Sequence, residues 1–186
     1  RPTLAVPAVL VSLLVLAPVA HATIAEALTM AELVQEADHA ALVEVIGLEP
    51  HYDELDRIVT DVTVRVVEPL VGPSRPGDTL VVRRLGGVVG DMGLRIEGEA
   101  TFILGERVIL FVEEVSGVLR PVGMSQGVFP VQRDGDDAEV VMPGGAGLSL
   151  VRPGGPSLGA GTPALAAPRP IDELLAEIRE LSAERR

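Results

Sequence analysis

One string in the sequence has the residue types and spacing of a hydrolase nucleophile. Gly123-Met-Ser125-Gln-Gly127 matches the Gly-x-Ser-x-Gly pattern, in which a sharp strand-to-helix turn presents a serine to a histidine base. Here the string lies between two strand-like segments, and no histidine follows His51. We therefore predict a tight turn or a sheet bulge at Ser125, and we keep hydrolysis by Ser125 as an alternative function.

Glycines and acidic residues suggest other sites, which the spacing does not support. Gly87-x-x-Gly90-x-x-Gly93 has the wrong spacing for a dinucleotide-binding loop and no helix follows it, so these glycines predict a bend. Two acidic loops lack the ligand order of a calcium loop, and we predict that both are solvated. They hold His51, Asp53, Glu54 and Asp56 in one case and Asp134, Asp136 and Asp137 in the other. We predict no catalytic, cofactor-binding or metal-binding residues, and no cofactor.

The elements that would position these residues are mostly strands. Thr29-Met-Ala-Glu32 is a capping box followed by apolar residues at helical spacing, which predicts a helix over residues 29–38. His39 then lies at the end of that helix. The segment 88–100 is rich in glycine and predicts a bent strand or a long loop that re-enters the sheet near 94–96. Alternating or continuous apolar residues predict strands at 40–48, 58–68, 78–85, 107–112, 118–122, 127–132 and 139–142.

Short strands joined by Gly and Pro turns, with no helices between them, favour a closed antiparallel sheet. The predicted fold class is mainly β: a small OB-like antiparallel β-barrel with a short N-terminal helix and a C-terminal amphipathic helix. We assign the barrel and its N-terminal helix to residues 23–142. Residues 143–170 are almost wholly Gly, Pro, Ala, Ser and Leu, which is typical of a flexible linker.

The C-terminal segment 171–186 carries one apolar stripe at helical spacing. We expect this helix either to dock on the barrel or to present the stripe to a partner. The stripe consists of Ile171, Leu174, Leu175, Ile178 and Leu181.

The first 22 residues have the pattern of a secretory signal peptide. A positive charge precedes an apolar run from Leu4 to Ala20, and Ala20-His21-Ala22 offers small residues to a signal peptidase. The run carries Pro7 and Pro18 and is short for a membrane span, so we expect cleavage before Thr23 and no stable membrane span afterwards. The expected location is secreted or periplasmic in a bacterium.

The composition limits the possible partners. The net charge is −12, with 27 acidic and 15 basic side chains, and there are no cysteines. Such an acidic chain repels phosphate backbones, and with one Tyr, three Phe and no Trp it has few rings for bases to stack on. Nucleic acid is therefore not an expected partner.

The order of these features resembles a group of uncharacterised exported bacterial proteins. The resemblance extends over about residues 29–133, through Met30-Ala-Glu-Leu-Val-Gln-Glu-Ala-Asp38, Asp61-Val-Thr-Val-Arg-Val-Val-Glu68 and Phe102-Ile-Leu-Gly-Glu-Arg-Val-Ile-Leu-Phe111. More distantly, the chain resembles the netrin-like module of tissue inhibitors of metalloproteinases, which implies an OB-type barrel with flanking helices. Those inhibitors act through an amino-terminal cysteine that this chain lacks, so their mechanism does not carry over.

These observations together predict an exported noncatalytic binding or interaction module, not an enzyme. Its partner would be a protein or another ligand of the cell envelope, of unknown identity. The alternatives are a protease-directed inhibitor of netrin-like type and the hydrolase using Ser125. Candidate binding surfaces are the glycine-rich segment 86–98, the loop 49–57 and the stripe of the last helix.

Overall fold

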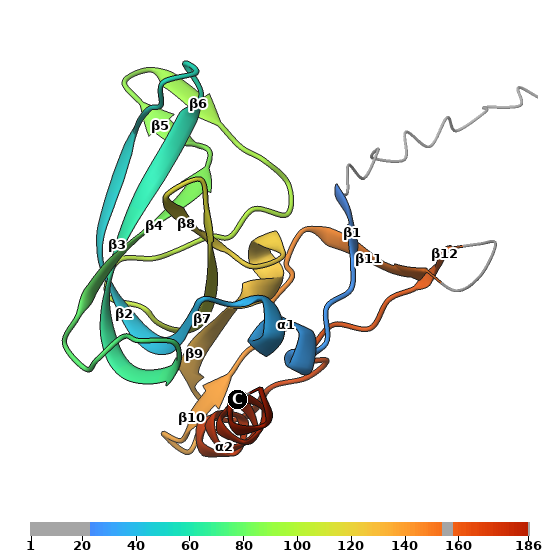
Figure 1. Cartoon of the computed structure of the whole chain (residues 1–186). Coiled ribbons are helices and arrows are strands. Elements are labelled where there is room, and N and C mark those ends of the chain that lie inside the picture. The colour runs from blue at the N-terminus through green and yellow to red at the C-terminus, as the bar shows by residue number, and fades with distance from the viewer. Residues whose placement is uncertain (1–22, 154–157, 186) are drawn as a thin grey trace, which may run out of the picture.

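The computed structural model describes residues 23–153 and 158–185, and the expected signal peptide, 1–22, lies outside them. The described chain is mainly β (Figure 1). Its helices are α1 (Met30–Glu36) and α2 (Ile171–Glu184), and a short 3-10 helix, η1 (Met124–Gly127), lies between β8 and β9. The strands are β1 (Thr23–Glu26), β2 (His39–Tyr52), β3 (Ile58–Val71), β4 (Thr79–Leu85), β5 (Gly87–Val89), β6 (Met92–Leu94), β7 (Arg107–Val115), β8 (Val118–Pro121), β9 (Val128–Arg133), β10 (Glu139–Val141), β11 (Leu148–Pro153), β12 (Leu158–Ala160) and β13 (Arg169–Pro170).

Eight strands form the main sheet, in the order β13-β10-β9-β7-β2-β3-β4-β8. Neighbours in this order run antiparallel except β4 and β8, which are parallel and share the single residue pair Val82 and Leu119. β8 also pairs antiparallel with β7. These pairings curl the sheet so that β8 lies beside both β4 and β7.

The first half of β2 and residues 108–112 of β7 are buried on both faces, because they lie between two apolar clusters. The alternation of side chains along a strand sends Val108 and Leu110 of β7 to one cluster and Ile109 and Phe111 to the other. The first cluster, the inner core, lies inside the curl of the sheet. It consists of Ala41, Val43, Val45, Val62, Val64, Val66, Val82, Ala100, Phe102, Val108, Leu110, Val112 and Val128.

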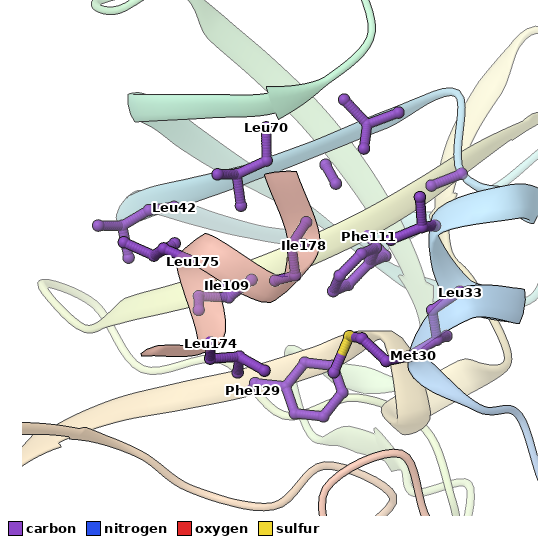
Figure 2. Close-up of a cluster of buried hydrophobic side chains, with 14 of the residues drawn as sticks. Met30, Leu33, Leu42, Leu70, Ile109, Phe111, Phe129, Leu174, Leu175 and Ile178 are labelled. Atoms are coloured by element: carbon purple, nitrogen blue, oxygen red, sulfur yellow. The ribbon is translucent and has the colours of Figure 1, made fainter. Parts of the chain in front are cut away.

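The second cluster, the helix-side core, joins the sheet to both helices (Figure 2). Phe111 and Phe129 meet edge to face with ring centroids 5.9 Å apart, and both are buried. α2 contributes Ile171, Leu174, Leu175 and Ile178, so the apolar stripe of the last helix docks on the sheet. The members from α1 are Met30, Leu33, Val34 and Ala37, and those from the rest of the chain are Ala40, Leu42, Leu70, Val71, Ile109, Phe111, Val122, Phe129, Val141 and Leu165.

Local signals explain both helices. The capping box of α1 is present: Glu32 N–H donates to the Thr29 hydroxyl, and the Thr29 N–H donates to the Glu32 carboxylate at 2.6 Å. At the other end of α1, Arg185 donates from Nη1 to the carbonyl oxygens of Val34 and Ala37, at 2.9 and 2.6 Å. A charge from α2 therefore satisfies the last carbonyls of α1 and ties the helices together.

Two predictions fail in glycine-rich segments. The composition of 143–170 predicts a flexible linker, but this range contains β11, β12 and β13, and β11 pairs in parallel with β1 in a three-stranded sheet. The segment 88–100 does not re-enter the main sheet near 94–96. Instead, β5 and β6 form their own antiparallel hairpin, in which Leu94 pairs with Gly87. Both errors arise because glycine-rich segments lack a clear apolar period.

No helix within the described residues is both long enough and apolar enough to cross a membrane.

Candidate functional site

Ser125 lies on η1, a single turn between β8 and β9, and is buried. Its hydroxyl donates to the carbonyl oxygen of Ala146 at 3.1 Å, and its N–H donates to the carbonyl oxygen of Gly98 at 3.1 Å. The predicted tight turn between strands is therefore present. Through these two hydrogen bonds, Ser125 holds the loops that contain Gly98 and Ala146 against η1.

The two histidines of the described chain have other neighbours. His39 Nδ1 lies 2.7 Å from the Ser74 hydroxyl. His51 Nδ1 lies 3.2 Å from the carbonyl oxygen of Glu49, and its Nε2 lies 3.7 Å from an Asp61 carboxylate oxygen. Both imidazoles therefore contact groups other than Ser125.

The two acidic loops are hairpin turns held by their own carboxylates. Asp53 accepts hydrogen bonds from the backbone of Leu55 and Arg57 and pairs with the Arg57 side chain at 2.6 Å, and these bonds lower the pKa of Asp53 to about 2. Asp134 accepts from the N–H groups of Asp136 and Ala138. Over residues 23–153 and 158–185, no cluster of three or more His, Cys, Asp or Glu side chains is arranged to hold a metal ion.

A cleft opens beside the β5–β6 hairpin, with a volume of about 430 Å³. We call it the hairpin cleft. Its walls come from Arg84 and β5, from the chain between Leu94 and Thr101, and from the loop 143–147; Ser125 also contributes to the wall. Figure 1 shows the hairpin at the end of the sheet far from α2. The segment 86–98, which the sequence indicates as a candidate binding surface, therefore borders a concave site.

Two glycines in the wall of the hairpin cleft, Gly98 and Gly144, have close neighbours that leave no room for a side chain. A Cβ at Gly144 would lie 2.7 Å from the Val128 carbonyl oxygen and 2.9 Å from the Ser125 carbonyl oxygen. A Cβ at Gly98 would lie 2.2 Å from Leu148 Cδ2, and Gly98 also has a φ of +85°, which favours glycine. These two positions let loops from distant parts of the sequence meet at the cleft.

Apolar side chains line part of the remaining wall. Val88 and Leu94 belong to the hairpin, and both are exposed. Ile96 is half-buried, Val128 is buried, and Pro130 also lines the cleft. The cleft therefore offers a ligand an apolar surface beside charged side chains.

Three half-buried charged residues lie at or behind the cleft wall: Arg84, Glu99 and Arg120. We call them the buried charge cluster, after the buried Nε atoms of the two arginines. Glu99 borders both the hairpin cleft and a smaller hollow of about 260 Å³, where Arg120 lies. Within the described chain, neither arginine forms an ion pair with Glu99, and the buried Nε atoms of both arginines have no hydrogen-bond partner. Such unpaired buried donors are uncommon in folded proteins.

Burial controls the protonation of this cluster. Burial raises the pKa of Glu99, and the backbone at Leu85 and Ala100 together with the two arginines opposes the rise only in part. Burial also lowers the pKa of Arg84, which the charge of Glu99 partly offsets. The cluster therefore holds charges that are neither fully solvated nor directly paired.

Sequence reasoning missed this cluster, although Arg84 leaves one signal in the sequence. Val82 belongs to the inner core and Leu80 packs against it, so Arg84 is the next residue on the inward face of β4. A charged residue at an inward position of a strand is a recognisable anomaly. Glu99 leaves no comparable signal, because it lies in a loop. Arg120 leaves none either, because β8 is only four residues long.

No family model, curated protein or solved structure matches this chain.

Proposed function

We propose that this protein is an exported noncatalytic binding module whose ligand site is the hairpin cleft. The observation that carries the proposal is the cleft itself: a concave surface that combines apolar side chains with polar and charged groups, of a size typical of small-molecule sites. Its walls come from four separate segments of the chain, 84–88, 94–101, 125–130 and 143–147, which the glycines at 98 and 144 allow to meet.

An OB-like barrel is the proposed scaffold of this site. The support is the set of strand pairings in which β2, β3, β4, β8 and β7 each lie beside two others of the five. The hairpin cleft then lies near one end of the barrel and the helix-side core covers its outer face. The distant resemblance to netrin-like modules belongs with this proposal.

Export is proposed from the pattern of residues 1–22. N-terminal sequencing of protein recovered from the periplasm or medium of a bacterial host tests it, with Thr23 as the expected first residue. Recovery of the uncleaved chain from the cytoplasm alone would contradict export.

The binding site is tested by placing bulk in the cleft. Ala146 is an exposed residue of the cleft wall, and Ala138 is an exposed residue of the β9–β10 turn. We expect indole, benzamide and hexanoate, added singly at millimolar concentration, to shift the backbone amide resonances of 87–88 and 144–147. Ala146→Trp should abolish these shifts, and Ala138→Trp should preserve them. If none of the compounds shifts these resonances, or if both variants respond alike, the cleft is not the binding site.

The alternatives have weaker support. Hydrolysis by Ser125 requires a base, and the contacts of His39 and His51 in the described chain lie elsewhere. Labelling of Ser125 by a serine-directed fluorophosphonate, lost in Ser125→Ala, would revive this function. The inhibitor function is tested by titrating the protein against secreted metalloproteases, for which unchanged cleavage rates would end it.

A further inference from the structure

The buried charge cluster points to the chemistry of the ligand. We infer that the hairpin cleft binds the carboxylate of an apolar acid, with the Arg84 guanidinium as its counter-ion and the apolar wall in contact with the rest of the molecule. This inference rests on the proposed binding function and adds the ligand class to it.

The charge of Arg84 has no directly paired anion within the described chain. Its side chain is half-buried in the cleft wall, where Nη1 donates to the carbonyl oxygen of Leu85 at 3.2 Å and the buried Nε has no partner in the described chain. The charge of Glu99 acts on Arg84, but within the described chain the two form no direct ion pair. A partly buried cation without a paired anion is unfavourable, and an anionic ligand would remove that cost.

Two arginines share the charge of Glu99. Glu99 lies at the wall between the cleft and the smaller hollow, so its single charge faces both Arg84 and Arg120. The other acid of that hollow is Glu113, which is opposite Arg120 in the pairing of β7 with β8. The arginine that faces the cleft is therefore the one with the least compensation.

The other arginine that lines the hairpin cleft is already paired. Arg95 pairs with Glu97, which also lines the cleft, at 2.9 Å. This pair is exposed at Arg95, so it adds little net charge to the cleft. An incoming anion would find Arg84 as the available cation of the cleft wall.

The charge of the whole chain narrows the class of anion further. A net charge of −12 repels polyanions at a distance, whereas a singly charged acid pays a smaller long-range cost. The cleft wall adds Val88, Leu94 and Ile96 as apolar contacts. A ligand with one carboxylate on an apolar body carries little charge and can contact these apolar side chains. Small organic acids and the apolar carboxyl end of a peptide both have this character.

The test compares acids with their uncharged amides. The probes are 3-phenylpropanoate and 3-phenylpropanamide, and the peptide Ala-Ala-Phe with a free or an amidated carboxyl end. Titrations followed by the amide resonances of 87–88 and 144–147 should show each acid binding about tenfold or more tightly than its amide. If 3-phenylpropanoate binds more tightly than the peptide acid, the ligand class is small organic acids. If the peptide acid binds more tightly, the ligand class is the carboxyl end of a peptide.

Three variants locate the counter-ion. Arg84→Gln should weaken binding of the acid about tenfold or more and leave the amide unaffected. Arg95→Gln, which makes the same change of charge at the rim, should weaken it less than about threefold. Glu99→Gln removes the competing carboxylate beside Arg84 and should tighten binding of the acid.

The outcomes separate this inference from the proposed function. Acids and amides that bind equally well, both blocked by Ala146→Trp, leave the cleft as a binding site and overturn the carboxylate inference. Weakening by Arg95→Gln to the same degree as by Arg84→Gln also overturns it. If neither these probes nor indole and benzamide bind in the cleft, the proposed function fails as well. Since the acid–amide comparison uses the unaltered chain, it stands even if Arg84→Gln does not fold.

Discussion

The helix-side core and the buried charge cluster show two ways in which this chain encloses side chains. The helix-side core packs apolar residues from both helices against the sheet, and Arg185 satisfies the last carbonyls of α1. The buried charge cluster encloses Arg84, Glu99 and Arg120 without direct ion pairs. The first arrangement stabilises the fold, and the second costs stability unless something binds there. Features that cost stability are where function is to be sought.

The largest expected effect lies in the helix-side core. Phe111 is buried beneath both helices and packs edge to face on Phe129. Phe111→Ala should lower the free energy of unfolding by about 3–5 kcal/mol, because it removes buried contacts and leaves a cavity. Urea denaturation measures this loss. Val81→Ala, at an exposed position of β4, should change it by less than about 0.5 kcal/mol, and equal losses would contradict a single packed core under the helices.

A smaller loss is expected at the floor of the hairpin cleft. Gly144→Ala places a methyl group within 2.7–3.0 Å of three backbone oxygens and should cost about 1–3 kcal/mol as the loop 143–147 moves away. Gly135→Ala is the matched control, since a Cβ there would meet no atom within 4 Å. Thermal unfolding measures both. A neutral Gly144→Ala would mean that the loop is not packed tightly against β9 and η1.

Removing the charge of Glu99 from the buried charge cluster should raise stability, whereas the two substitutions above lower it. Because burial raises the pKa of Glu99 above its usual value of 4.5, the charged form is disfavoured in the folded state. This penalty is present above the folded pKa and disappears below the unfolded pKa. Glu99→Gln should therefore raise the midpoint of thermal unfolding at pH 7–8, and the difference from the unaltered chain should vanish below about pH 4.

Glu97→Gln is the control for this pH dependence, since Glu97 pairs with Arg95 at the exposed rim of the same cleft. It should give no comparable gain at pH 7–8. A destabilising Glu99→Gln at neutral pH would show that Glu99 is paired with Arg84 or Arg120 in solution, and would weaken the case for a missing anion.

The smallest effect is expected at the exposed capping box of α1. The hydrogen bonds from Arg152 and Thr29 lower the pKa of Glu32 from 4.5 to about 2. A depressed folded pKa stabilises the fold above the unfolded pKa, and this contribution is lost as the pH falls from about 4.5 towards 2. Glu32→Gln should cost roughly 0.5–1 kcal/mol at pH 7 and nothing near pH 2. A carboxyl NMR titration checks the pKa directly, and an ordinary value for Glu32 would contradict the pairing with Arg152.

Much of the fold was predictable, because its signals are local. The alternation of Val62, Val64 and Val66 predicts a strand buried on one face, and all three belong to the inner core. The Thr29–Glu32 capping box predicts where α1 begins. For the candidate site, the predicted turn at Ser125 is present, whereas the Arg84–Glu99 neighbourhood was missed. Glu99 lies in a loop, and a loop has no periodic sequence pattern that would indicate which residues it contacts.

Residue types and periods of two or 3.6 residues suffice to predict the mainly β character of the chain, both helices and the excess of acidic residues. No such pattern predicts that the stripe of α2 docks on the sheet or that β11 returns to pair with β1. The same holds for the cleft that Arg84, Glu99 and the loop 143–147 share. These contacts join segments far apart along the chain, so they depend on how whole elements pack and not on any local pattern.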